Sequence, residues 1–357
     1  MAASVGLGHT ATGASNGMVI SPFGRHQASV LAAGSAHSVV AAFDLFGRDQ
    51  ATVEVVMKAL THQAQIAFGS LATRPIDRLG QPSQSSLETL VGGAAVAESS
   101  PVFAVGVGAS LFDSRFGLGA LRPSELVPMP VFPHDQLEPK MGHGDMVVQV
   151  SGDTESACIA TLRRVAADLQ ASAELRWSMS GFAGTEARNL MGFSEGQGNP
   201  AVAPPDDLNA FPWVDASDQA WAAGGSYLAV RLIKLNTAAW DRTPLSGQES
   251  VIGRRKISGA RFANELSVGS HVGRLQPSDG DGVAMVRRSY NYADGMGDQG
   301  LIFMAHQRSF RDGFLRAQER LAGEKLHDYT TTFGGGFFLT LPGLASIDDW
   351  YGSALLS

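Results

Sequence analysis

Residues 226–235 read SYLAVRLIKL, an apolar run with β-branched and aromatic side chains that predicts a buried strand. A helical pattern over residues 239–256 follows this strand. Beyond it, the sequence predicts another strand, a helix and a last strand over residues 300–306, 309–322 and 336–341. This order of elements predicts an α+β module in which helices cover a sheet.

The N-terminal half has the same order of elements. Its apolar runs are SVVAAFDL at 38–45, VFAVGV at 102–107 and DMVVQV at 145–150. Helical spacing follows the first and third runs, at Val53, Val56, Met57 and Leu60 and at Ile159, Leu162, Val165 and Leu169, with Asp153 or Thr154 as the cap of the second helix. We therefore expect one split βαβ module used twice.

The expected organisation is a flexible arm over residues 1–24, an N-terminal domain over 25–180 and a C-terminal domain over 181–357. Most of the Gly, Asn and Pro residues that break regular structure lie in residues 178–222, between the two halves. Seams between domains are favoured places for ligand pockets, so we expect a site there.

Composition narrows the classes of partner. The chain has 357 residues, of which 44% are hydrophobic and 17% charged, and its net charge is −7. A nucleic-acid partner would call for a basic stripe, and an anionic membrane surface would call for clustered Lys and Arg. The Lys and Arg residues of this chain are scattered along the sequence, so we expect neither partner. No run of about 18 apolar residues is present, so we expect no membrane span. The compartment and the oligomeric state stay open, and a homo-oligomer is possible.

The segment GFSEGQGNP at residues 192–200 places one carboxylate, Glu195, between two glycines. One interpretation is a surface turn with a solvated acid, because Gly, Ser, Asn and Pro favour turns. The other is that the glycines bring the backbone close to a flat ligand, with the carboxylate directed at it. The local chemistry alone leaves both interpretations open.

Four polar residues farther along are also candidates. His271 lies in a loop-like segment, where a histidine can be structural, solvated or a metal ligand. Arg287 and Arg288 are adjacent, so on an extended strand one can face solvent and the other a site. Asp298 stands at the mouth of an apolar strand, as a turn residue or as the group that orients a histidine.

Six ordered segments carry a family resemblance: RNLMGFSEGQGNP, WDRTPLSGQESVIGRRK, SHVGRLQP, VRRSYNY, DQGLIFMAHQR and QERLAGEKLHDYTTTFGGGFF. Together they resemble the dye-decolorizing peroxidases, a haem family, from about residue 25 to the end of the chain. The segments GASLFD and RNLMGF are similar to its deferrochelatase-like and often exported branch. The resemblance implies two ferredoxin-like modules with antiparallel sheets and haem b, iron protoporphyrin IX, at the seam.

The resemblance also implies roles for particular residues. His271 takes the place of the proximal iron ligand, and Glu195 and Arg287 take those of the distal catalytic acid and arginine. Asp298 is a candidate partner of the proximal histidine, and Leu301 and Phe303 match apolar residues near the distal face of the haem. The remaining positions that match haem contacts are Gly196, Gln197, Gln276, Pro277 and Ser278.

One departure from the family bears on activity. The family has Asp where this chain has Glu195. The extra methylene displaces the carboxylate by up to about 1.5 Å, and a misplacement of about 1 Å can cost about a hundredfold in rate.

We expect a peroxidase that uses hydrogen peroxide to oxidise bulky phenolic or dye-like donors through a ferryl intermediate. The alternative is a haem-binding or haem-handling protein with little turnover.

Large donors cannot reach iron buried at a seam, so electrons are expected to pass through surface aromatic residues. Trp and Tyr are the side chains that can be oxidised. The candidates in or beside the matched segments are Tyr329, Trp213 and Trp240.

Overall fold

The structure is a computed structural model, and it describes residues 23–31, 34–68, 101–197, 199, 211–262, 269–275 and 282–357. Of the expected arm over 1–24, residues 1–22 lie outside these ranges. Phe23 and Gly24 lie inside them and pair with Leu344 near the C-terminus.

The N-terminal half is a βαββαβ module. Its elements are α1 (Ala28–Leu31), β1 (His37–Leu45), α2 (Gln50–Ala67), β2 (Val102–Gly108), β3 (Met146–Gly152), α5 (Glu155–Leu169) and β4 (Ala173–Phe182). The strand order is β2-β3-β1-β4, and all three pairings are antiparallel, which is the ferredoxin-like arrangement. Asp49 caps α2 and Thr154 caps α5, each through a side-chain oxygen that accepts a backbone N–H.

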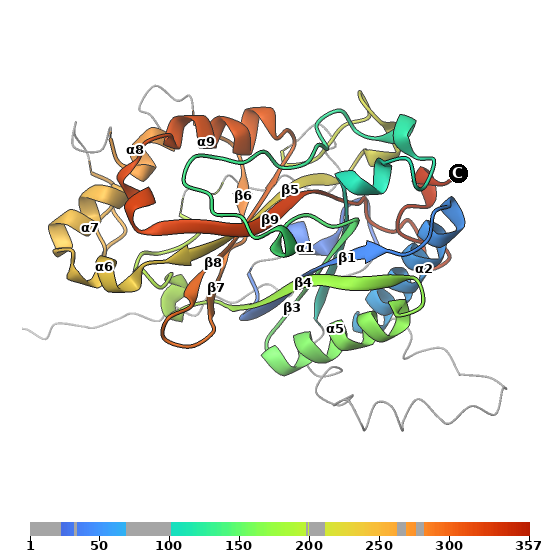
Figure 1. Cartoon of the computed structure of the whole chain (residues 1–357), viewed down its shortest axis with the longest axis horizontal. Helices are drawn as coiled ribbons and strands as arrows, with labels where there is room; N and C mark the ends of the chain where they lie inside the picture. The colour runs from blue at the N-terminus through green and yellow to red at the C-terminus, as the bar shows by residue number, and fades with distance from the viewer. Residues whose placement is uncertain are drawn as a thin grey trace, which may run out of the picture.

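The C-terminal half has the same plan with shorter helices. Its elements are β5 (Ser226–Leu235), α6 (Thr237–Arg242), α7 (Leu245–Ile252), α8 (His271–Leu275), β6 (Val286–Arg287), β7 (Tyr290–Ala293), β8 (Gln299–Gln307), a π-helical turn (Arg311–Leu315), α9 (Arg316–Leu321) and β9 (Thr330–Thr340). The helix predicted over 239–256 is two helices, because Pro244 forces the residue before it into extended backbone. Helices α6 to α9 lie together at one end of the molecule, while α2 and α5 lie at the other (Figure 1).

The two halves share one antiparallel sheet that closes on itself. Strand β2 pairs with β9, and β4 pairs with β7 through Phe182 and Asn291. Strand β5 pairs with both β8 and β9, which completes the ring. The inner face of the closed sheet buries one apolar core, which contains Val40, Trp177, Leu228, Val230, Ile302 and Phe338. The predicted α+β class with two ferredoxin-like modules is confirmed, and the division at residues 180 and 181 stays a proposal.

Burial explains which strands the sequence predicts. Strands β1, β2 and β3 are almost entirely buried because helices cover one face and the inner core covers the other, so they read as continuous apolar runs. Strand β4 is missing from the prediction. Seven of its ten positions are partly or fully exposed, and its sequence AELRWSMSGF has no apolar run.

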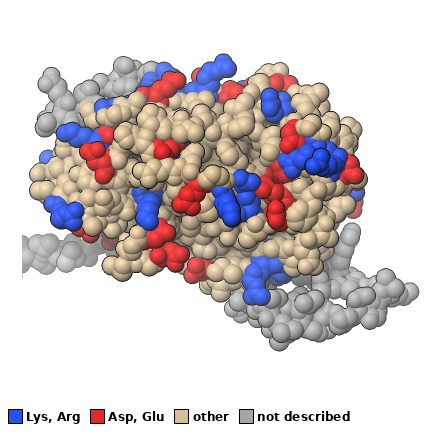
Figure 2. Space-filling view, viewed as in Figure 1, with Lys and Arg blue, Asp and Glu red and all other residues tan. Residues whose placement is uncertain are grey.

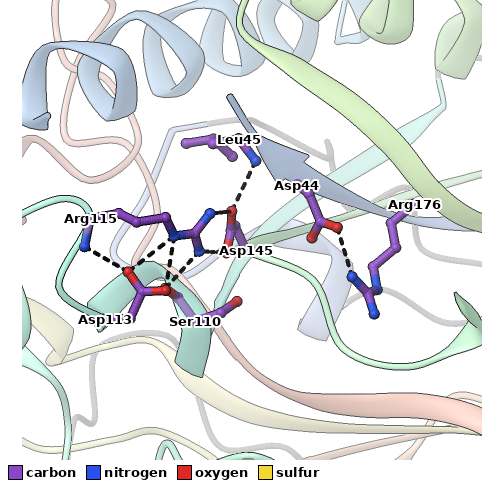
Figure 3. A network of polar contacts seen from close by, with 7 residues as sticks. All are labelled: Asp44, Leu45, Ser110, Asp113, Arg115, Asp145 and Arg176. Carbon is purple, nitrogen blue, oxygen red and sulfur yellow. Dashed lines mark hydrogen bonds and ion pairs between the residues drawn. The ribbon is translucent and has the colours of Figure 1, made fainter. Parts of the chain in front are cut away.

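A polar network fixes the ends of β1 and β3 in the N-terminal half (Figure 3). Asp145 is buried and receives two bonds from Arg115, at 2.6 and 2.9 Å, and one from the backbone N–H of Leu45 at 2.9 Å. Arg176 binds Asp44 at 2.7 Å beside it. Removing Arg115 would leave the buried charge of Asp145 without its ion-pair partner, which typically costs about 3–5 kcal/mol, so this pair must stay complete.

The surface has no strong charge pattern on the face that Figure 2 shows, where acidic and basic side chains are interspersed. Among the helices that the structure describes, none has the length and apolar character needed to cross a membrane.

Candidate active site

The candidate site is a cavity of about 250 Å³ in the C-terminal half. Its floor is the outer face of β5 and β8, and its walls come from α7, α8, α9 and the loop 189–197. Pro133, His134 and Asp135 of the N-terminal half close one side. The cavity therefore lies where the two halves meet, with most of its lining from the second half.

Glu195 reaches this cavity from a tight loop. Its backbone N–H bonds the carbonyl of Ala187 at 2.7 Å, and Arg188 pairs with Ser194 in an isolated bridge. Gly196 follows with φ of 72°, a conformation that favours glycine, so the glycine is explained by the turn itself. The carboxylate oxygen Oε1 accepts a bond of 2.6 Å from Nδ2 of Asn189.

Burial shifts the protonation equilibrium of Glu195 toward the neutral form. Desolvation raises the pKa of its carboxyl, and the bond from Asn189 and the positive charges of Arg287 and His271 oppose that rise. A carboxyl with a raised pKa gives up and takes back a proton more readily near neutral pH, as a general acid–base group must.

Asn199 holds Arg287 at the same cavity. The side-chain amide of Asn199 bonds both the backbone N–H and the carbonyl of Arg287, at 3.1 and 3.0 Å. Its guanidinium donates to the carbonyl of Gln197 at 2.8 Å. Burial lowers the pKa of Arg287, and the charge of Glu195 opposes this. Arg288 does not face solvent as the alternation suggested, because it is half-buried beside Tyr290 in a crevice.

His271 is the first residue of α8, and it lines the cavity. Its Nδ1 lies 2.8 Å from Oε2 and 3.1 Å from Oε1 of the buried carboxylate of Glu324. This pairing leaves Nε2 as the nitrogen available to a metal, and a carboxylate on Nδ1 makes an imidazole a stronger donor.

The sequence interpretation of Asp298 needs correction. Asp298 lies at the β7–β8 turn with its side chain 48% exposed, 3.4 Å from Lys234 and 3.3 Å from the hydroxyl of Tyr292. Glu324 occupies the place expected for it, beside His271. Asp298 is therefore not the acid that pairs with His271. Glu324 lies within the matched segment QERLAGEKLHDYTTTFGGGFF, but only the folded chain brings it to α8.

The other predicted site residues divide into two groups. Leu301 and Phe303 alternate with buried residues along β8 and form part of the cavity floor, and Gly196 and Gln197 lie on its rim. Gln276, Pro277 and Ser278 lie outside the described residues. Sequence reasoning missed the two asparagines, Asn189 and Asn199, that hold the catalytic candidates.

Two family models match almost the whole chain. The N-terminal part of the Dyp-type peroxidases matches residues 27–183, and the C-terminal part matches residues 186–345. The chain belongs to the Dyp-type peroxidase family. It is therefore a haem peroxidase, an oxidoreductase that binds haem.

Relatives agree with this membership. A deferrochelatase from Escherichia coli (strain K12) is 33% identical over 369 residues, which cover 94% of this chain and 86% of that protein. Ferric DtpA from Streptomyces lividans has a TM-score of 0.81 and 28% identity, covering 94% of this chain and 96% of its own. A DyP-type peroxidase from Cellulomonas bogoriensis has a TM-score of 0.80 and 27% identity, covering 95% and 98%.

The residues of the cavity fit a haem. The apolar side chains of Leu301, Phe303 and Leu321 suit a flat macrocycle, and His271 offers one imidazole nitrogen. Arg254 lines the same cavity as Arg287, and burial together with the positive charges of Arg261 and Arg287 lowers the pKa of Arg254. Cations that repel one another at a cavity wall favour an anionic ligand group, such as a haem propionate.

The pairing of Glu324 with His271 gives a direct prediction. Replacing Glu324 by Gln is expected to weaken haem binding or activity by about 10–100-fold and to raise the reduction potential of the iron, because the imidazole becomes a weaker donor. Haem titration and spectroelectrochemistry measure the two effects. Asp298→Asn is the matched control, and an equal effect of that control would contradict the assignment of Glu324.

Proposed function

We propose that this chain uses hydrogen peroxide to oxidise bulky phenolic or dye-like donors, with a ferryl haem between the two half-reactions. The observation that carries the proposal is the placement of Glu195, Arg287 and the His271–Glu324 pair around one cavity. His271 would hold the iron of a bound haem, and Glu195 and Arg287, which line the same cavity, would act on the peroxide. The bound haem supplies two-electron reduction of peroxide and then accepts single electrons from donors.

The proposed work of the protein is proton transfer and charge stabilisation. Peroxide must lose a proton at one oxygen and gain one at the other before its O–O bond breaks heterolytically. Glu195 in its ionised form takes the first proton and returns it to the leaving oxygen, a role that its raised pKa supports. Arg287 stabilises the negative charge that develops on the oxygens. Arg287 is half-buried in the wall of the cavity and bonded to the carbonyl of Gln197, so it is already oriented when peroxide arrives.

Steady-state turnover tests this proposal. The haem-loaded chain is mixed with hydrogen peroxide and either a bulky dye or a small phenol, and the loss of each donor is followed. We expect oxidation of both, and a loss of at least about a hundredfold in a haem-loaded Glu195→Gln, Arg287→Leu double variant. Equal rates in the two proteins would contradict the roles of these residues.

The name of the Escherichia coli relative favours a second candidate, a haem-handling role with little peroxide turnover. The change from the family's Asp to Glu195 supports the same candidate. Full haem occupancy with no donor oxidation in the turnover assay is the result that this candidate predicts. Whether the chain forms a homo-oligomer stays a prediction.

Electron transfer from bulky donors is proposed to run through Tyr329 and Trp240. Their rings lie 5.0 Å apart, and Nε1 of Trp240 donates to the carbonyl of Met191, which lines the cavity. Tyr329 is partly exposed, whereas Trp240 is buried and so cannot be a surface site. Trp213 is also buried and stacks on His26, so the surface role expected for it is wrong.

We expect Tyr329→Phe to lower the turnover of a bulky dye while the reaction with peroxide alone keeps its rate, because phenylalanine is far harder to oxidise. Trp213→Phe is the matched control and is expected to leave dye turnover unchanged. Parallel assays with a dye and a small phenol measure the effect. If dye turnover survives in both variants, the relay through Tyr329 is wrong.

A further inference from the structure

Asn189 makes an unusual set of contacts beside Glu195. Its Oδ1 accepts the backbone N–H groups of Met191 and Phe193, each at 3.1 Å. Its Nδ2 donates to Oε1 of Glu195 at 2.6 Å. The orientation of this amide is determined by its surroundings, because the reverse orientation would set its oxygen against the carboxylate and its NH₂ against two N–H groups.

The turn that carries Asn189 is itself fixed. Asn291 of β7 is buried, and its side chain accepts the N–H of Leu190 and donates to the carbonyl of Arg188, both at 3.0 Å. The indole of Trp240 donates to the carbonyl of Met191 at 3.0 Å. The amide of Asn189 is therefore a fixed donor, and the flexible partner in the contact is the side chain of Glu195.

A fixed donor limits the freedom of the longer acid, although the extra methylene still displaces its carboxylate. Glu has one more rotatable bond than Asp, so without an anchor its carboxylate would spread over several rotamers. The bond to Asn189 selects one of them and occupies Oε1. We propose that Asn189 is a positioning residue for the reaction, which holds the carboxylate of Glu195 in one place and leaves Oε2 to exchange the proton. This inference rests on the proposed acid–base role of Glu195.

The electrostatics of the cavity agree with the geometry. Burial raises the pKa of Glu195, and the bond from Asn189 is the largest effect that opposes it. The charged and titratable groups acting on Glu195 are Arg287 from β6 and His271 from α8, and Arg254 lines the same cavity. Loss of the Asn189 donor therefore raises the pKa of Glu195 further and reduces the fraction that can accept a proton.

The decisive variant is Asn189→Asp in the haem-loaded chain. Aspartate keeps an oxygen for the N–H groups of Met191 and Phe193 but has no N–H for Glu195. The measurement is the rate of the haem absorbance change after one equivalent of hydrogen peroxide, as a function of pH. Since the ionised form of Glu195 is the active one, the rate falls as the pH drops through its pKa. We expect the midpoint of that fall to move to higher pH in the variant.

Asn291→Asp is the matched control. It removes one donor from the same turn without touching Glu195, so it is expected to lower stability and leave the midpoint in place. An equal shift of the midpoint in this control would overturn the inference, because the effect would then come from loosening the turn.

A second readout does not depend on activity. Two carboxylates in contact are expected to lower the denaturant midpoint of unfolding of Asn189→Asp at neutral pH. Adding Glu195→Gln reverses the donor and acceptor, so the double variant is expected to recover most of the loss. No recovery would overturn the contact.

The two readouts separate the inference from the function on which it rests. If Glu195→Gln leaves the peroxide reaction at the wild-type rate, the proposed acid–base role is wrong, whatever the double variant does. If Glu195→Gln slows the reaction but Asn189→Asp keeps the wild-type pH midpoint, the role stands and the inference about Asn189 is overturned.

Discussion

Replacing His271 by alanine is expected to remove most of the haem from the protein. The imidazole is the proposed iron ligand, and its Nδ1 is already bound by Glu324 at 2.8 Å. Loss of a supporting contact alone typically costs about 10–100-fold in affinity, so loss of the ligand itself should cost more. Haem titration of the purified variant, followed by absorbance, measures the effect.

His306→Ala is the matched control for this experiment. His306 lies on β8 but is fully buried among residues away from the cavity, and burial lowers its pKa to about 3, so it is held neutral. Its replacement is expected to leave the haem spectrum of the folded protein unchanged. Wild-type haem affinity in His271→Ala would contradict the assignment of the ligand.

The second large effect is expected at Arg287. In the proposed reaction its fixed positive charge stabilises the negative charge that develops on peroxide, and removing such a stabiliser typically costs about 10²–10³-fold in rate. We therefore expect Arg287→Leu to slow the reaction of the haem-loaded protein with peroxide by this factor, measured by stopped-flow absorbance at fixed pH. Each variant must first be shown to hold a full complement of haem.

Glu195→Gln provides the comparison. General acid–base help is worth about 10²–10⁴-fold when well placed, and the extra methylene of Glu reduces that benefit. We expect Glu195→Gln to slow the reaction less than Arg287→Leu does. The reverse order would mean that the extra methylene does not displace the carboxylate, held by Asn189, from a productive position.

The sequence predicted many of the strands and helices because burial and periodicity agree in them, while the ferredoxin-like arrangement with antiparallel sheets came from the family resemblance. The continuous apolar runs of β1, β2, β3 and β5 reflect strands covered on both faces. The closure of the sheet through β2–β9 and β4–β7 could not be predicted, because edge-to-edge pairing leaves no periodic signal in either strand.

The sequence predicted the site residues that lie in matched motifs. It did not predict the residues whose roles depend on contacts between distant parts of the chain. Glu195, Arg287 and His271 were found through the matched motifs, and the structure places all three at one cavity. Asp298 was predicted because it stands at a strand mouth, and Glu324 was not considered because it meets His271 across 53 residues of sequence. Asn189 and Asn199 read as ordinary loop residues, since only the folded loop reveals their bonds.

The most direct test of the account is the reaction of the ferric, haem-loaded chain with one equivalent of hydrogen peroxide, followed by stopped-flow absorbance. We expect a rapid change of the haem spectrum at a rate proportional to peroxide concentration, followed by recovery in two one-electron steps when a phenolic donor is added. A fully haem-loaded protein whose spectrum does not respond to peroxide would contradict it.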